Sequence, residues 1–219
     1  MYVLHHVPDW ASMVVNMTLA ELGQSYRLHR VDHEAGALTQ APHLALHPFG
    51  KIPVLETPDG PIFETGAILL WLADRHGKMA PPPESADRGA FLSWLFFLSN
   101  TLHPAAMDLL HPERPAGPAH ARAVAEIAHT RLTTQLGVLE AVIVTGQPAW
   151  ASEATIFSYY LSMLLRWIEV FPAYDDLAIG SAQFPALHAI ARAMETRPAA
   201  LRAARTEGVS GAFFSNPKG

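Results

Sequence analysis

The chain has 219 residues, of which 50% are hydrophobic and 16% are charged, and its formal net charge is −5. This length allows one large domain or two small ones, and the apolar content excludes an intrinsically disordered chain. No apolar run approaches the ~18–20 residues of a membrane span, and the N-terminus does not resemble a signal peptide, so we expect a cytoplasmic protein. The mild acidity argues against a nucleic-acid partner.

The chain contains no cysteine. This excludes disulfides, thiolate metal ligands, iron–sulfur ligation and a cysteine nucleophile supplied by the chain itself. Any reactive thiol at a site in this protein therefore has to arrive with a ligand.

The first part of the chain predicts a thioredoxin-like domain over residues 1–77, with a βαβ–ββα order and a four-stranded mixed sheet. Short apolar runs and turn signals place the strands at 2–6, 26–31, 52–56 and 61–63. Helical spacing, with Ser12 in the N-cap position of the first helix and Gly77 as the stop of the second, places the helices at 12–22 and 65–76. A right-handed crossover makes the first two strands parallel.

Three consecutive prolines in the segment 78–85 predict a linker, and the rest of the chain, 86–219, predicts an all-helical domain. Apolar residues recur there at three- and four-residue spacing, which indicates a bundle of five or six helices. Ser152 is expected to cap the core helix that contains residues 157–168.

The stretch Gly50-Lys51-Ile52-Pro53-Val54-Leu55 places a proline at the start of a strand. If the bond before Pro53 is cis, the backbone N–H and C=O of Ile52 face outward instead of joining the sheet. An edge of this kind can bind an extended peptide by adding a strand. The alternative interpretation is an ordinary proline between a loop and a strand.

Glu64 and Thr65 stand at the first turn of the helix 65–76, beside backbone N–H groups that lack helical partners. Glu64 suits the ammonium of an amino acid, while Thr65 and the N–H groups suit its carboxylate. A plain helix cap with an acidic neighbour is the alternative.

In their joint order and spacing, these segments resemble the cytosolic glutathione transferases, and the pattern is nearest to bacterial beta-class members. The resemblance is carried by Tyr2-Val3-Leu4 running to Pro8, Leu19–Gly23 before Tyr26, Gly50–Leu55, Asp59-Gly60 before Glu64-Thr65, and Ile68–His76. It implies a homodimeric detoxification enzyme, without a metal, that conjugates glutathione as a cosubstrate to a small hydrophobic electrophile.

The resemblance also implies the glutathione-binding residues. Ile52 and Pro53 correspond to the position that binds the cysteine backbone of glutathione, and the pair Glu64 and Thr65 corresponds to the one that holds its γ-glutamyl end. Lys51 is a candidate for the glycine carboxylate.

A thiol reacts as its thiolate, so the protein has to lower the thiol pKa with a hydroxyl donor or a helix N-terminus. By resemblance this happens in the loop after Pro8, where Ala11 replaces the beta-class cysteine and Trp10 replaces a delta-type serine. Ser12 is the remaining hydroxyl, and we predict that it stabilises the thiolate; the alternative is a helix cap only. His103 resembles a beta-class histidine near the sulfur and is predicted to assist, although Pro104 replaces the lysine of that class.

We expect an apolar substrate pocket between the domains, since ligand clefts form there. The predicted wall residues are Trp10, Phe49, His103, Met107, His111 and Trp167. Two alternatives stay open: a non-catalytic binding or interaction protein of this fold, favoured by Trp10 and Ala11, and a glutathione-dependent isomerase or dehalogenase. The twelve histidines form no shared helical face with a third ligand, so no metal site is expected.

Overall fold

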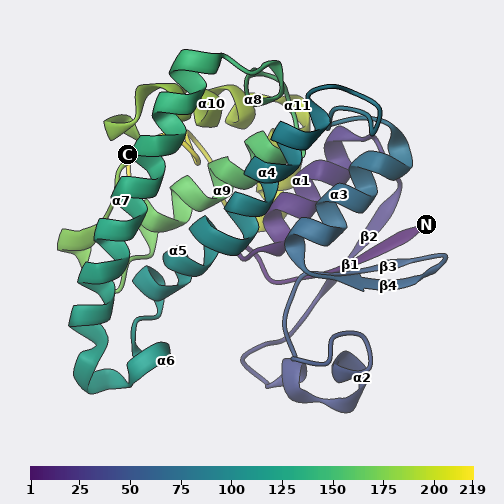
Figure 1. Cartoon of the computed structure of the whole chain (residues 1–219). Coiled ribbons are helices and arrows are strands. Elements are labelled where there is room, and N and C mark those ends of the chain that lie inside the picture. Colours follow the sequence, from purple (N-terminus) through teal and green to yellow (C-terminus); the bar gives the residue numbers. More distant parts are fainter. The chain divides into compact units, whose positions relative to one another are not determined.

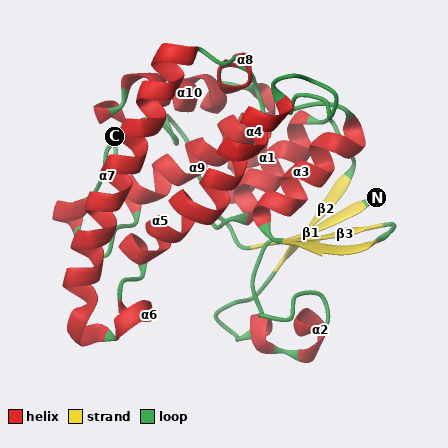
Figure 2. Ribbon diagram, viewed as in Figure 1, coloured by secondary structure: helices red, strands yellow, loops and turns green.

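The structure is a computed structural model that describes residues 1–219 and divides them into two compact units (Figures 1 and 2). The first unit comprises Met1–Ser85 and Arg197–Ser210, and the second comprises Ala86–Thr196 and Gly211–Gly219. The sequence predicts one helical domain over 86–219, whereas the segment 197–210 groups with the N-terminal unit because its helix packs on the helix α1 (Ser12–Glu21).

The first unit is built on a four-stranded sheet in the order β2-β1-β3-β4, as predicted. Its strands are β1 (Tyr2–His6), β2 (Tyr26–Arg30), β3 (Val54–Thr57) and β4 (Gly60–Phe63). β1 runs parallel to β2 and antiparallel to β3, and β3 and β4 form the hairpin. This is the thioredoxin-like mixed sheet expected from the sequence, with β3 starting two residues later than predicted.

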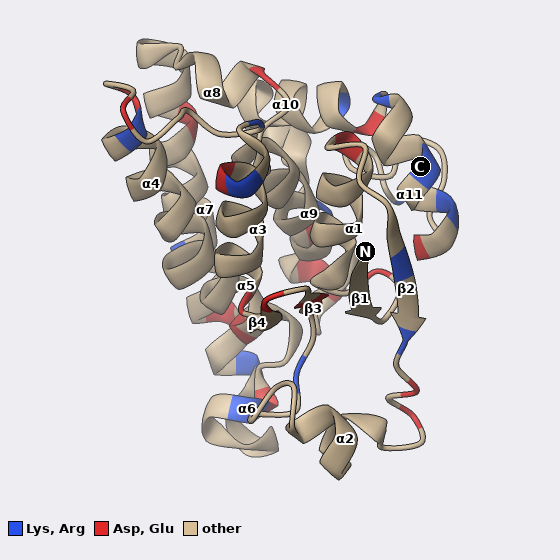
Figure 3. Cartoon of the chain, turned by 90° about the vertical axis from the view of Figure 1, so that its right-hand side faces the viewer, with Lys and Arg blue, Asp and Glu red and all other residues tan.

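Four helices accompany the sheet: α1 (Ser12–Glu21), α2 (Ala41–Leu44), α3 (Thr65–His76) and α11 (Pro198–Glu207). Figure 3 shows α1 and α3 above the strands and α2 below them. α1 contacts both α3 and α11, so eight consecutive residues from Ser12 to Leu19 are buried. The helix therefore buries polar groups such as Asn16, which need partners inside the unit.

Asn16 finds its partners on α11 and β2. The buried Glu207 accepts a hydrogen bond from the Asn16 side-chain nitrogen through Oε1 (2.6 Å) and one from the Asp9 backbone N–H through Oε2 (2.9 Å). The Tyr26 hydroxyl donates to the Asn16 side-chain oxygen (2.6 Å). Burial raises the pKa of the Glu207 carboxyl to about 7. These bonds attach the C-terminal helix to the N-terminal domain.

The second unit contains helices and no strand. Its helices are α4 (Arg88–Phe97), the π-helical turn η2 (Leu98–Leu102), α5 (His103–Leu110), α6 (Glu113–Ala116), α7 (Ala121–Gly146), α8 (Ala149–Ser152), α9 (Ile156–Val170) and α10 (Pro185–Glu195). α9 is the core helix, because every residue from Ile156 to Ile168 is buried. None of the helices of the chain combines the length and the apolarity that crossing a bilayer requires.

The cap of α9 is Thr155, and the prediction that Ser152 caps it was wrong. The Thr155 hydroxyl accepts the Ser158 backbone N–H (3.2 Å) and donates to the Trp150 carbonyl (2.8 Å). Ser152 instead ends the short helix α8 and donates to the carbonyl of Ala149. The intervening helix α8 moves the start of α9 three residues along the chain.

We expect Thr155→Ala to destabilise the second unit by about 1–2 kcal/mol, because it removes the cap of a buried helix and leaves the Ser158 N–H without its acceptor. Thr155→Ser should retain most of the stability. Urea unfolding followed by circular dichroism measures both variants. Thr134→Ala, which removes an exposed hydroxyl bonded to the Thr130 carbonyl, is the matched control, and an equal loss in the control would contradict the role of the cap.

The raised pKa of Glu207 predicts a pH-dependent stability. Between about 4.5 and about 7 the folded carboxyl keeps a proton that the unfolded chain releases, so the free energy of unfolding falls as the pH rises through this window. The loss should reach about 3 kcal/mol. Urea unfolding at several pH values should show this loss in the wild type. It should be absent in Glu207→Gln, because the side chain at position 207 then has no titratable proton. The same pH dependence in both proteins would contradict the assignment.

Candidate functional site

The register of the sheet brings three chain segments to one of its ends. Val54, the first residue of β3, pairs with His5 of β1 on one side and with Phe63 of β4 on the other. The residues just beyond these pairs therefore gather at the same end: Ile52 and Pro53 before β3, Glu64 and Thr65 after β4, and Val7 to Ala11 after β1.

The peptide bond between Ile52 and Pro53 is cis, which is the condition that the sequence analysis set for a binding role of Ile52. Pro53 is buried and Ile52 is partly exposed. The sheet ladder begins only at Val54, and neither the N–H nor the C=O of Ile52 has a hydrogen-bond partner in the chain. Ile52 thus offers one backbone donor and one backbone acceptor to an extended peptide.

Glu64 and the first turn of α3 form the second part of this end. Glu64 has φ 73° and its side chain is exposed, while Thr65 is buried. The first helical bond runs from the Ile68 N–H to the Glu64 carbonyl, so the N–H groups of residues 65–67 have no acceptor in the chain. A carboxylate, a hydroxyl and free N–H groups therefore meet where an amino acid's ammonium and carboxylate can both be bound.

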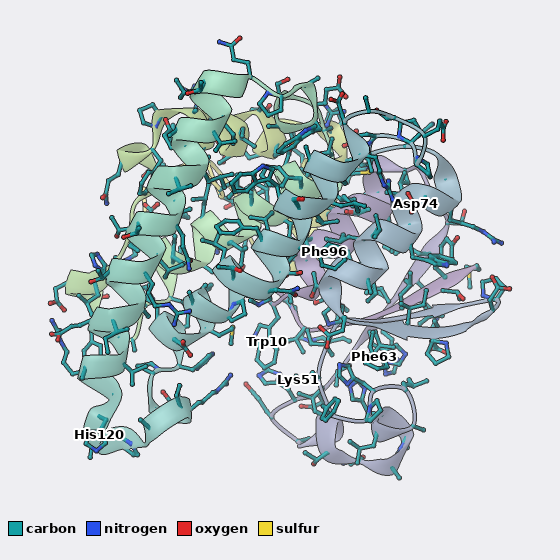
Figure 4. The ribbon with its side chains drawn as sticks, viewed as in Figure 1. Trp10, Lys51, Phe63, Asp74, Phe96 and His120 are labelled. Carbon is teal, nitrogen blue, oxygen red and sulfur yellow. The ribbon has the colours of Figure 1, made fainter.

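The loop before Ile52 is held in place by His43 of α2. Its side-chain Nε2 donates to the Lys51 carbonyl (2.9 Å), so the Lys51 backbone is fixed while its side chain stays exposed. Gly50 has φ 59°, and a Cβ there would lie 2.6 Å from the Leu38 carbonyl oxygen, so the turn requires glycine. Figure 4 labels Lys51 and Trp10 at the end of the sheet from which these loops extend.

Ser12 lies in the first turn of α1 with its hydroxyl engaged inside the fold. The hydroxyl donates to the Val7 carbonyl (3.0 Å) and accepts the Val7 N–H (3.2 Å), and the residue is fully buried. A hydroxyl has a single proton to donate. This geometry differs from the expectation that Ser12 points at a bound sulfur, and it also differs from the expected cap, because Ala11 is the N-cap residue of α1.

The start of α1 nevertheless offers a donor. The Ala11 backbone N–H has no acceptor in the chain, and it stands at the positive end of the α1 dipole. Beside it, the half-exposed Trp10 packs its ring against His33, with ring centroids 4.8 Å apart. The loop thus combines a free N–H with an exposed aromatic surface.

Four of the predicted pocket residues belong to the second unit. His103, Met107 and His111 recur every four residues along α5 and its end, and His103 Nδ1 is hydrogen-bonded to the Tyr160 hydroxyl (2.7 Å). The Trp167 ring packs edge-on against His103, with centroids 5.4 Å apart. The structure thus brings His103 and Trp167 into contact, while Trp10 and Phe49 are exposed residues of the first unit.

Several histidines gather on the face of the sheet that carries α2. The His5 ring lies 4.6 Å from that of His29 and 5.9 Å from that of His43, and its Nε2 is bonded to Glu56 (2.7 Å). Burial lowers the pKa of His5. No group of three or more histidine or acidic side chains is arranged to hold a metal ion.

Two residues that support the site were missed from the sequence. His43 was considered only as a metal ligand because of its spacing from His47, and its bond to Lys51 depends on the fold of α2. Glu207 reaches Asp9 from 198 positions away, and no local pattern marks it. A contact between residues so far apart in the sequence can be recognised only once the packing of α11 on α1 is known.

Comparison with known proteins identifies related sequences and related structures. A family model described as "Glutathione S-transferase, N-terminal domain" matches residues 1–74. Glutathione S-transferase F10 of Arabidopsis thaliana is 35% identical over 96 residues, which cover 42% of this chain and 45% of that relative. The match therefore spans less than half the length of this curated relative.

Two solved structures match over nearly the whole chain. A beta-class glutathione S-transferase of Sphingomonas chungbukensis is 26% identical, with a TM-score of 0.75 and coverage of 94% of this chain and 98% of that one. A sphingomonad glutathione S-transferase solved in complex with glutathione is 28% identical, with a TM-score of 0.74 and coverage of 95% and 100%. Together with the fold and the residues at the end of the sheet, these matches show that the chain belongs to the cytosolic glutathione transferase family.

Proposed function

We propose that this chain is a glutathione transferase that conjugates the thiolate of glutathione to a small hydrophobic electrophile. The observation that carries the proposal is the combination of unpaired groups at one end of the sheet: the backbone of Ile52, and Glu64 and Thr65 with the free N–H groups of α3. Homodimerisation, a cytoplasmic location and a detoxifying role are proposed with it, by analogy with the family.

Each end of glutathione has a proposed partner. The Glu64 carboxylate would bind the γ-glutamyl ammonium, and the Thr65 hydroxyl and the first N–H groups of α3 would bind its carboxylate. The Ile52 N–H and C=O would pair with the backbone of the cysteine residue, as in the addition of a strand. The exposed Lys51 ammonium would attract the glycine carboxylate.

For the chemistry, the bound thiol loses its proton to solvent and the thiolate sulfur forms a bond with the electrophilic carbon. The leaving group departs with its bonding electron pair, as chloride does from chlorodinitrobenzene. In place of the Ser12 hydroxyl, we assign the stabilisation of the thiolate to the Ala11 N–H and the N-terminus of α1, which need no side-chain proton. Ser12 then fixes the turn that presents this N–H.

The electrophile would contact apolar side chains. Trp10 and Phe49 are exposed aromatic residues of the first unit. In the second unit we propose His103, Met107, His111 and Trp167, with His103 in an assisting role as a hydrogen-bond donor. The His103–Tyr160 bond fixes the orientation of that ring.

A second candidate function is a glutathione-binding or interaction protein without catalysis. The engaged Ser12 hydroxyl favours it, because no hydroxyl at the β1–α1 loop is then free to donate to a thiolate. Binding of glutathione without turnover of chlorodinitrobenzene would support this candidate over the enzyme.

Glu64→Gln should weaken glutathione binding by about tenfold or more, since it removes the charge that pairs with the γ-glutamyl ammonium. Thr65→Val, which keeps the shape and removes the hydroxyl, should weaken binding less. Isothermal titration calorimetry measures both. Glu113→Gln, at an exposed position of α6, is the control for the loss of one negative charge, and equal affinities in wild type and Glu64→Gln would contradict the proposed site.

Ser12→Ala separates the two roles considered for this residue. The buried Val7 N–H loses its acceptor, so we expect a loss of stability of about 1–3 kcal/mol. Turnover per folded molecule should stay within about threefold of wild type at a temperature where the variant is folded. Unchanged stability with a loss of turnover of about a hundredfold or more would instead support the original prediction that its hydroxyl stabilises the thiolate.

A further inference from the structure

Glu207 is a buried carboxylate that no step of the proposed reaction uses. It lies in the last turn of α11 and is only 2% exposed. One of its oxygens accepts the backbone N–H of Asp9, which is two residues before Ala11 in the loop between β1 and α1. The other oxygen is bonded to Asn16 in the middle of α1. A single side chain thus connects α11 to the loop and to the helix that follows it.

Asp9 has an unusual backbone conformation. Its φ is 59°, in the left-handed region, which a residue with a Cβ adopts only at an energetic cost. Such a conformation persists when neighbouring contacts determine it. The bond from the Asp9 N–H to Glu207 is a contact of this kind, and the turn at Asp9 sets the direction in which Trp10 and Ala11 leave β1.

We propose that Glu207 is a positioning residue for the proposed reaction: it holds the turn at Asp9 that presents the Ala11 N–H to the bound sulfur, and protonation of its carboxyl weakens this hold. The inference rests on the proposed function, because it concerns the loop to which the thiolate is assigned. Glu207 itself touches neither glutathione nor the electrophile in this scheme.

The surroundings of Glu207 allow both protonation states. Asp9 faces it from the β1–α1 loop, Asn16 from α1 and Tyr26 from β2. On α11, Thr206 shares the Asn16 amide with it, and Arg202 lies near Tyr26. The pKa of Tyr26 is raised by burial and by the charge of Glu207, and Arg202 opposes this shift. Burial brings the pKa of Glu207 to about 7, so both states are populated near neutral pH.

The Asn16 amide can match either state by rotating through 180°. When Glu207 is ionised, the Asn16 nitrogen donates to it and the Asn16 oxygen accepts from Tyr26. When Glu207 is neutral, its hydroxyl can donate to the Asn16 oxygen, and the Asn16 nitrogen can donate to the Tyr26 oxygen. The Asp9 N–H keeps an acceptor in both states, but its bond to the ionised carboxylate is the stronger one.

The first arm of the test follows the Asp9 amide by NMR in the ¹⁵N-labelled full chain, without glutathione. From about pH 5 to about pH 9 we expect this amide to titrate with a midpoint near 7 in the wild type and to stop titrating in Glu207→Gln. Asp9→Asn, which retains the amide, should keep the titration. An amide that does not titrate in the wild type, or that titrates unchanged in Glu207→Gln, would overturn the inference.

The second arm measures kcat and KM with glutathione and chlorodinitrobenzene across the same pH range. Glu207→Ala should lower kcat/KM by about tenfold to a hundredfold, while Glu207→Gln retains an acceptor and should stay closer to wild type. The ratio of kcat/KM of the wild type to kcat/KM of Glu207→Gln should rise with pH. The midpoint of this rise should equal the midpoint of the Asp9 amide titration. Glu195→Gln is the control for the loss of a buried carboxylate. Glu195 lies in the second unit, where it accepts hydrogen bonds from the Phe214 and Ser215 N–H groups.

The outcomes separate the two proposals. A merely structural Glu207 would lower the amount of folded enzyme and leave the pH profile of kcat/KM unchanged in Glu207→Gln, which would overturn the inference while the proposed function stands. A wild type that neither binds nor turns over glutathione would overturn the proposed function, and with it the role of Glu207 in positioning the loop for that reaction. The Asp9 titration then still decides whether Glu207 holds the loop.

Discussion

Backbone groups that regular structure leaves unpaired at one end of the sheet are the constraint on which the candidate site depends. The ladder of β3 begins at Val54 and the first helical bond of α3 belongs to Ile68, so Ile52 and the first turn of α3 keep free donors and acceptors. Polar backbone groups of this kind need partners. An extended peptide with an amino-acid end can pair with all of them, which supports the proposed ligand class.

Because the chain contains no cysteine, it cannot itself supply a sulfur nucleophile at this site. In the proposed reaction the sulfur nucleophile belongs to the ligand, so the chain would contribute orientation and charge stabilisation. The Ser12 hydroxyl is hydrogen-bonded inside the fold, so backbone N–H groups and the dipole of α1 would stabilise the thiolate. Backbone donors can be displaced only by moving the loop that carries them, which is why the contacts of Asp9 and Glu207 matter for the chemistry.

The sheet, and the position of Ile52, Glu64 and Thr65 at one end of it, could be predicted from the sequence because their signals are local. Alternation, turn residues and Pro53 mark the strands within a few positions, and Glu64-Thr65 adjoins a helix start. The structure differs from the expected orientation of Ser12, the expected cap Ser152 and the expected domain of the segment 197–210 for a common reason. A hydroxyl near a helix start has several candidate acceptors, and only the packing decides between them: Val7 for Ser12, and Ala149 for Ser152. Likewise, the apolar pattern of an amphipathic helix such as α11 does not indicate which unit the helix packs against.

The most direct test of the site is the mapping of amide chemical shifts on addition of glutathione to the ¹⁵N-labelled wild-type chain, with the dipeptide cysteinylglycine as the comparison. The account predicts that the amides of Ile52 and of Thr65, Gly66 and Ala67 shift together with glutathione, and that those of α3 stay unchanged with cysteinylglycine, which lacks the γ-glutamyl end. Shifts confined to other parts of the chain, or equal effects of the two ligands on α3, would contradict it.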